Sequence, residues 1–392
     1  MLDTSKTSPG RVALTACLTL AAALQPIAPA FAGPNDQAKR LFDRLTGTPP
    51  SATVLQQMSS DISSNNATAA AQIAMQDPAF YNVTVRNFAA PMTNVAQSVF
   101  VPLNDYTATI IGMVRDNVPF NTVLSADLVY TGNMSGVPAY SPSNNNHYQY
   151  LDTNNADLSK VLQPQMQSSL TGIPSAATAG VMTTTAGASA FFSLGTNRRM
   201  LRFTMMNFMC NDLNTIMDIT RPPDRIRQDP SRSPGGDSRT FLSTCIGCHS
   251  GMDAMAGAFA YYDFDTNSNQ LVYTPGQVQA KYSINTANFP YGHVTTDDSW
   301  INYWRQGSNA VLGWSSSQPG SGNGAKTFGQ EIENSSQFAS CQVQKVFQAM
   351  CLRAPGNAAD RSKVSQITAD FVSSGYNMKT AFAESAVYCM GQ

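Results

Sequence analysis

The sequence is poor in charge and in histidine. Asp, Glu, Lys and Arg make up 12% of the 392 residues, about half of the usual share of roughly 25%, and the net charge is −1. A chain this close to neutral offers no basic surface for nucleic acid, so we expect no nucleic-acid partner. The only histidines are His147, His249 and His293. So few imidazoles argue against Ser-His-Asp catalysis and against a zinc site with several histidine ligands.

A phosphate-binding loop is missing as well. Residues 320–327 (GSGNGAKT) nearly match the pattern, but Ala325 stands where the last glycine is required, and no apolar strand precedes the segment. We therefore expect a flexible surface loop there.

Long apolar runs are absent beyond the N-terminus, so we expect no transmembrane segment. Lys6 and Arg11 precede an apolar stretch at 12–24, which is shorter than the ~20 residues that a membrane-spanning helix needs. An Ala-x-Ala cleavage site follows at 30–32. This order is typical of a secretory signal peptide. We predict that residues 1–32 are removed and that the chain is exported to the periplasm, the cell surface or beyond.

Cys245-Ile246-Gly247-Cys248-His249 is a C-x-x-C-H motif, the attachment signal of c-type haem. The spacing lets both thiols reach the two vinyl groups of one porphyrin, and the adjacent imidazole then points at the iron as proximal ligand. Because c-type haem is attached after export, the signal peptide supports this interpretation. The rivals are a zinc site, for which further ligands are scarce, and a thioredoxin-like pair, for which the βαβ context is missing. We predict one covalent haem c held by Cys245, Cys248 and His249.

The second axial ligand of the iron is less well defined, because methionine is absent from 256 to 349. The only histidine in that span is His293, which is our leading candidate for a second metal ligand. Met350, Met378, His147 and methionines upstream of the motif stay open. A vacant sixth position is a further alternative, and it would imply ligand or peroxide chemistry.

Arginine is dense ahead of the motif. Haem carries two propionates, and arginine pairs well with carboxylates. Arg198, Arg199 and Arg239 are therefore candidates for binding the cofactor, and Arg202 and Arg225 lie nearby in sequence. The alternative for each is an exposed polar face or a salt bridge that fixes a loop.

The seven cysteines leave four outside the signal peptide and the motif: Cys210, Cys341, Cys351 and Cys389. An even number in an oxidising compartment predicts two disulfides. Apolar spacing over 340–351 predicts a helix, which would hold Cys341 and Cys351 about 15 Å apart, beyond the ~7 Å that a disulfide allows. Each should therefore pair with Cys210 or Cys389, in either combination.

Several stretches resemble the planctomycete-type cytochrome c family, whose chains carry a single C-x-x-C-H motif. The motif is followed here by Met252-Asp253 and by a Gly-x-Phe segment at 257–259, and shorter similarities lie at 113–120 and 371–379. The family pattern has Met-Asp-Pro-Leu-Gly where this chain has Met-Asp-Ala-Met-Ala-Gly, which is one residue longer. The resemblance implies an all-α haem c protein and supplies no known reaction.

The fold class that we expect is mainly α, helical with long irregular loops around one covalently bound haem c. Helical spacing occurs at 38–45, 51–62, 105–114, 196–213, 336–352, 359–373 and 378–389. The regions that we expect are a signal peptide (1–32), an N-terminal helical region (33–135), an irregular Asn/Ser/Gly-rich connection (136–195), a haem c-binding region (196–335) and a C-terminal helical region (336–392).

The function that we expect is electron transfer by an exported monohaem c-type cytochrome, with an unknown redox partner protein or a small-molecule electron donor or acceptor. The alternative is a haem-dependent oxidoreductase or peroxidase with an open sixth iron position. A third hypothesis is a binding or structural protein in which the haem mainly stabilises the fold.

Overall fold

The computed structural model describes residues 32–193, 195–228, 239, 241–283 and 291–391. Residues 1–31 of the predicted signal peptide lie outside this part. The protein is mainly helical, with 56% helix and 7% strand, as the sequence predicts. The strands in the described ranges form only two-stranded antiparallel sheets, which pair β1 with β2, β3 with β4 and β5 with β6.

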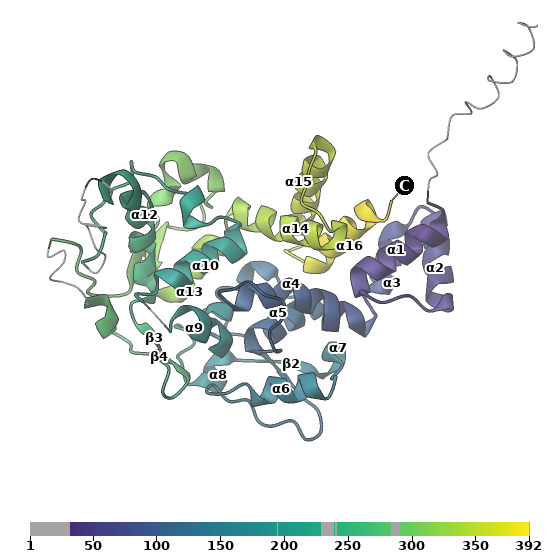
Figure 1. Cartoon of the computed structure of the whole chain (residues 1–392), viewed down its shortest axis with the longest axis horizontal. Coiled ribbons are helices and arrows are strands. Elements are labelled where there is room, and N and C mark those ends of the chain that lie inside the picture. The colour runs from purple at the N-terminus through teal and green to yellow at the C-terminus, as the bar shows by residue number, and fades with distance from the viewer. Residues whose placement is uncertain (1–31, 194, 229–238, 240, 284–290, 392) are drawn as a thin grey trace, which may run out of the picture.

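Three N-terminal helices form one end of the molecule: α1 (Pro34–Thr46), α2 (Ala52–Ser63) and α3 (Ala67–Ala74) (Figure 1). Ser51 caps α2 as predicted, because its Oγ accepts a hydrogen bond from the backbone N–H of Val54 at 3.3 Å. The last helix, α16 (Met378–Cys389), packs against α1 and α3. The two ends of the described chain therefore meet, and Gln37 Nε2 donates to the carbonyl of Gly391.

The centre of the molecule is organised around α5 (Asp105–Arg115), in which residues 105–114 are all buried. A helix that is buried on every side belongs to the core. The elements of this part of the chain are η1 (Phe80–Val85), α4 (Arg86–Ala89), η2 (Ala90–Thr93), η3 (Phe120–Thr122), β1 (Val129–Gly132), α6 (Asn146–Thr153), α7 (Leu158–Val161), β2 (Leu162–Gln165), α8 (Gln167–Thr171), η4 (Gly180–Thr183) and α9 (Thr185–Phe191). The stretch 136–195, which we expected to be irregular, thus contains several short elements.

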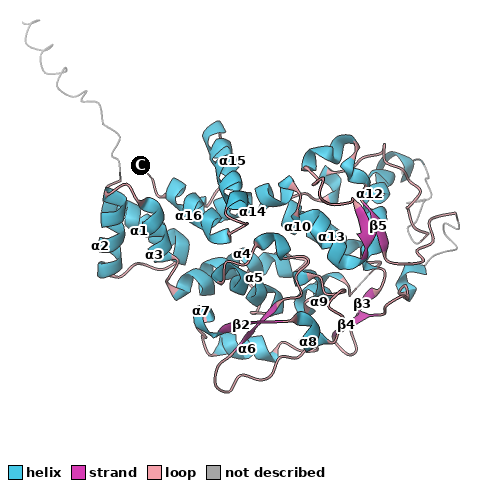
Figure 2. Cartoon of the chain, turned by 180° about the vertical axis from the view of Figure 1, so that it is seen from behind, coloured by secondary structure: helices cyan, strands magenta, loops and turns pink. Residues whose placement is uncertain are grey.

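The C-x-x-C-H motif lies at the end of the molecule opposite to α1–α3 (Figure 1). The elements of this part are α10 (Arg198–Met209), η5 (Leu213–Thr215), η7 (Phe241–Cys245), α12 (Ile246–Ala256), η8 (Gly257–Phe259), β3 (Tyr262–Asp265), β4 (Gln270–Tyr273), η9 (Ala280–Ser283), β5 (Ser299–Ile301), η10 (Tyr303–Arg305), η11 (Gly307–Leu312), β6 (Ser321–Asn323) and α13 (Gly324–Glu333). Figure 2 shows β5 beside α12, and the two are in contact.

Residues 320–327 do not form the flexible surface loop that we expected. Ser321–Asn323 are strand β6, which pairs with β5, and α13 begins at Gly324. The φ angle of +73° at Gly324 is in the left-handed region, which glycine adopts without strain, and it lets the chain turn from strand into helix. The glycines therefore serve a tight strand-to-helix connection.

Two disulfides fix the C-terminal helices, one to the rest of the fold and one to each other. They pair Cys210 with Cys341 and Cys351 with Cys389, with Cα–Cα distances of 5.4 and 5.3 Å. Cys341 and Cys351 both belong to α14 (Ser336–Cys351), so the prediction that they do not pair with each other is confirmed. The remaining helix is α15 (Ala358–Ser373), which packs on α14 and α16.

The hydrophobic core is one contiguous cluster that runs from Ala38 in α1 to Ala386 in α16 and includes Met252 and Met255 of α12. The motif helix therefore rests on the same core as the N-terminal helices. No helix in the described part of the chain is long and apolar enough to cross a membrane.

Candidate functional site

The motif spans the junction of two helical segments. Cys245 ends the π-helical turn η7 and is also the N-cap residue of α12, while Cys248 and His249 lie in the first turn of α12. Both thiols are free and half-buried, whereas the other cysteines of the described ranges form disulfides. Two thiols and one imidazole are thus gathered on a single helical turn.

The Cys248 thiol is held in its protonated form. Its Sγ lies 3.5 Å from the carbonyl oxygen of Leu213, to which it donates. Burial raises the pKa of this thiol, and the neighbouring Cys245 and Asp212 raise it further. The described strands form only two-stranded antiparallel sheets, so the βαβ context of a thioredoxin-like pair is missing from the described part of the chain.

His249 has two ring nitrogens in different surroundings. Its Nδ1 lies 3.3 Å from each carboxylate oxygen of Asp253, one helical turn further along α12. The ring of Phe241 lies 6.2 Å away between centroids. Because Nδ1 faces a carboxylate, Nε2 is the nitrogen left for a metal. The side chain is 20% exposed, so it remains accessible.

Asp253 is the most strongly bound group of the site. Its side chain is fully buried. Arg198 binds both oxygens, through Nε at 2.6 Å and a terminal nitrogen at 2.8 Å, and the backbone N–H of Arg227 donates to one of them at 3.2 Å. Burial alone would raise the pKa of Asp253, but the charge and hydrogen bonds of Arg198, with help from His249 and Arg227, hold it well below its usual value. The carboxylate facing His249 is therefore ionised.

Glycines let α12 pack closely on its rear face. A Cβ atom at Gly251 would lie 2.1 Å from Nε1 of Trp304, and one at Gly257 would lie 2.2 Å from the carbonyl oxygen of Ser299. Trp304 is fully buried and supports the helix from behind. Only glycine at these positions permits such contacts.

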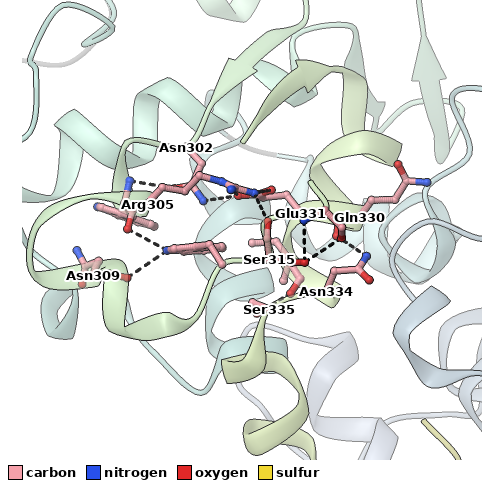
Figure 3. Close-up of polar contacts among 12 residues, drawn as sticks. Asn302, Arg305, Asn309, Ser315, Gln330, Glu331, Asn334 and Ser335 are labelled. Carbon is pink, nitrogen blue, oxygen red and sulfur yellow. Dashed lines mark hydrogen bonds and ion pairs between the residues drawn. The ribbon is translucent and has the colours of Figure 1, made fainter. Parts of the chain in front are cut away.

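A buried polar network fixes the segment that carries Trp304 (Figure 3). Arg305 donates to both oxygens of Glu331 in α13 at 2.8 and 2.7 Å, and Asn302 donates to the same carboxylate at 2.7 Å. Arg305 also donates to the carbonyl of Ser315. Because the carboxylate of Glu331 is almost fully buried, this ion pair is shielded from water and holds η10 firmly against α13.

The apolar surface beside the motif is exposed. Met217 and Ile219 pack against Gly247, between the two motif cysteines, and they are 46% and 64% exposed. Leu242, three residues before Cys245, is 61% exposed. We call Met217, Ile219 and Leu242 the apolar rim. Large exposed apolar side chains that gather around one motif are typical of a surface that a ligand or partner covers.

The arginines that the sequence offers as cofactor-binding candidates lie in different surroundings. Arg198 pairs with Asp253, and Arg202 pairs with Asp212 at 2.6 Å. Arg199 is half-buried on α10, and Arg239 is exposed, just ahead of the motif. Arg198 therefore contacts the motif helix by pairing with Asp253. The cofactor-binding roles of Arg199 and Arg239 stay predictions.

His293 lies next to Arg227. Its backbone N–H donates to the carbonyl of Ile226 at 2.8 Å, and its carbonyl accepts from Gln228 at 3.3 Å. Burial lowers the pKa of its imidazole, and the positive charge of Arg225 lowers it further. The ring lines a pocket of about 220 Å³ together with Asp253. Asp253 marks the Nδ1 side of His249, whereas an iron would bind at Nε2, so this placement does not favour His293 as the second ligand.

The other second-ligand candidates also have structural roles. His147 is buried, its Nε2 accepts from the backbone N–H of Gly132 at 2.8 Å, and its Nδ1 donates to the carbonyl of Pro138. Met350 and Met378 are buried in α14 and α16, away from α12 (Figure 1). Within the described ranges no three His, Cys, Asp or Glu side chains are grouped as metal ligands would be.

Sequence reasoning missed two contributors to this site. Asp253 entered only as part of a family resemblance, although its spacing of four residues from His249 places it on the same helix face. Trp304 had no signal beyond being one of three tryptophans, because its contact with Gly251 spans more than fifty residues of sequence.

No protein-family model, curated protein or solved structure matches this chain. The resemblance to planctomycete-type cytochromes c therefore depends on the motif residues themselves.

Proposed function

We propose that this chain is an exported monohaem c-type cytochrome that transfers electrons through a haem attached at Cys245 and Cys248, with His249 as the proximal iron ligand. The observation that carries the proposal is the pair of free thiols on one helical turn beside an imidazole whose Nδ1 is already engaged. In an oxidising compartment, thiols without a disulfide partner need another reason to be retained.

The donor set fits a haem c. The two thiols supply the thioether positions, and His249 offers Nε2 because Asp253 occupies Nδ1. The exposed side chains of the apolar rim would supply apolar contact to a porphyrin held there, and the half-buried thiols lie within reach of solvent. When bound, haem supplies a one-electron iron couple whose potential depends on axial ligation, burial and hydrogen bonding.

Residues behind α12 fix the orientation of the motif. Trp304 and the Arg305–Glu331 pair hold the rear face of α12, so the motif turn keeps a fixed direction. The exposed rim would leave one edge of the cofactor near the surface, where a redox partner protein or a small-molecule donor or acceptor can approach. Large apolar side chains at the rim suit a transient partner surface.

A second candidate function is a haem-dependent oxidoreductase or peroxidase with an open sixth iron position. The observation that favours it is the placement of the second-ligand candidates: His293 lines a pocket with Asp253, the residue that engages Nδ1 of His249, and both ring nitrogens of His147 are in use. This alternative needs a general base on the open side, and histidine is too scarce to supply one readily.

The first experiment is a pair of double variants. Cys245→Ser with Cys248→Ser should abolish covalent haem, seen as loss of haem staining after denaturing electrophoresis. Cys351→Ser with Cys389→Ser removes two cysteines elsewhere and should keep the stain. Haem that stays attached to the first variant would refute the proposal.

Absorption spectra of the purified wild-type chain separate the two functions. Sharp low-spin bands without a response to carbon monoxide support electron transfer. A high-spin spectrum that changes on addition of carbon monoxide or peroxide supports the second candidate.

A further inference from the structure

The contact between His249 and Asp253 is unusual in its symmetry. Both carboxylate oxygens lie 3.3 Å from Nδ1, so one N–H is shared between two acceptors. The residues are four apart in α12, so the helix itself fixes their separation. The distance is long for a hydrogen bond, and it leaves room to shorten when Nε2 binds a cation and makes Nδ1–H a stronger donor.

The carboxylate cannot turn away from His249. Arg198 grips both of its oxygens from α10, and the backbone N–H of Arg227 holds one of them from a third segment. The side chain is fully buried, so water does not compete for it. Arg227 is itself anchored, because it donates to Oγ1 of Thr196 at 2.8 Å and lies 4.5 Å from the ring centre of Tyr282.

Resting on the haem attachment proposed above, we propose that Asp253 is a positioning residue that sets the reduction potential of the bound haem through Nδ1–H of His249. A carboxylate that accepts this proton makes the imidazole a stronger electron donor. A stronger donor stabilises the ferric iron relative to the ferrous iron and lowers the potential. Arg198 raises the reduction potential, because its positive charge draws negative charge away from the carboxylate of Asp253.

The decisive variant is Asp253→Asn in the haem-loaded protein. It keeps the shape of the side chain and removes the charge. We expect the ferric-to-ferrous equilibrium to shift about tenfold toward the ferrous form, which for one electron corresponds to 59 mV. We also expect the NMR signal of the His249 Nδ1–H to move upfield, because an amide oxygen is a weaker acceptor than a carboxylate. Spectroelectrochemical titration and NMR are the two measurements.

Asp212→Asn is the matched control. Asp212 also lies near the motif, since its charge acts on Cys248, and it also pairs with an arginine, Arg202. It is not among the partners of His249 in the described structure. We expect a smaller shift of the equilibrium and an unchanged Nδ1–H signal. Equal shifts in the two variants, or an unchanged Nδ1–H in Asp253→Asn, would overturn the proposal in favour of a simple charge effect.

Arg198→Gln is a second test of the role of Asp253, which can be used if Asp253→Asn does not fold. This variant leaves the carboxylate in place without its main counter-charge. We expect the equilibrium to shift toward the ferric form while the Nδ1–H signal does not move upfield. A shift toward the ferrous form, or none, would contradict the role of Asp253. A wild-type chain purified without haem refutes the proposed function instead, so the two failures are distinguishable.

Discussion

At the scale of single residues, His147 and His249 differ in the group that their Nδ1 atoms contact. In His147 this nitrogen donates to the carbonyl of Pro138, whereas in His249 it faces an ionised carboxylate. The remaining nitrogen of His147 is used by Gly132, and that of His249 is free for a metal. The same residue type therefore supports the fold at one position and suits iron at the other.

His293→Ala tests the second axial ligand. Because His293 lines a pocket with Asp253, which engages Nδ1 of His249, we expect the haem to stay attached and the absorption spectrum to stay unchanged. A change from low-spin to high-spin bands would identify His293 as the iron ligand that the sequence predicts. Haem staining of the same sample shows that attachment itself is intact.

At the scale of elements, α12 depends on its glycine face. Gly251→Ala places a methyl group within 2.1 Å of Nε1 of Trp304, which the surrounding network holds in place. Alanine ordinarily favours a helix by up to about 1 kcal/mol over glycine. Overpacking should outweigh this gain, and we expect a net loss of about 1–3 kcal/mol in the free energy of unfolding. Urea unfolding measures it.

Gly356→Ala is the control for that substitution. Its nearest neighbours would lie 3.9 Å from the added Cβ, so the methyl group meets no obstruction. We expect its free energy of unfolding to stay near that of the wild type. A Gly251→Ala variant as stable as Gly356→Ala would show that Trp304 moves freely.

The contact between Glu333 of α13 and the chain just after η3 should make the stability of the folded protein depend on pH. Glu333 is buried, accepts from the backbone N–H of Leu124 at 2.9 Å and from Ser125, and burial raises its pKa to about 8. Its folded pKa lies above its unfolded value, so its contribution to stability is complete below about pH 4.5 and is lost as pH rises toward about 8. The free energy of unfolding should therefore fall with rising pH across that window.

Glu333→Gln should remove this fall, because an amide does not titrate. We expect the stability of the wild type to fall more between pH 5 and pH 8 than that of the variant, as measured by urea unfolding at each pH. Parallel pH profiles would show that Glu333 is already ionised in the folded protein.

The elements that could be predicted from the sequence are those with local signals. Helical spacing predicts α1, α2, α5, α10 and the three C-terminal helices, and the helix length across Cys341 and Cys351 excludes one disulfide pairing. β6 could not be predicted, because Ser321–Asn323 has no apolar alternation and exists only by pairing with β5. The Arg198–Asp253 pair was missed for the same reason, since its partners lie 55 residues apart.

At the scale of the whole molecule, the continuous core joins the motif helix to both ends of the described chain. Ala38 and Ala386 belong to the same cluster as Met255 of α12. The motif helix is therefore part of a large cooperative body. A simple carrier needs far less protein around its haem, so we expect the additional surface to bind a partner.

Export should change the whole chain, because it removes the predicted signal peptide. Expression of the full chain in a host with a haem c maturation system should give a mature protein that begins at Gly33 and carries one haem per chain. N-terminal sequencing and a pyridine haemochrome assay measure these two quantities. A protein that retains residues 1–32 would contradict the predicted signal peptide, and retention of the haem in that case would leave the motif assignment intact.

The Cys210–Cys341 disulfide closes a loop with a sequence separation of 131 that contains the whole motif. Within that loop, Cys248 is already packed against Leu213, and η5 lies directly after Cys210. Because the two ends of this loop stay joined when the helices come apart, the bond limits the conformations open to the motif segment in the unfolded chain, and this favours the folded state.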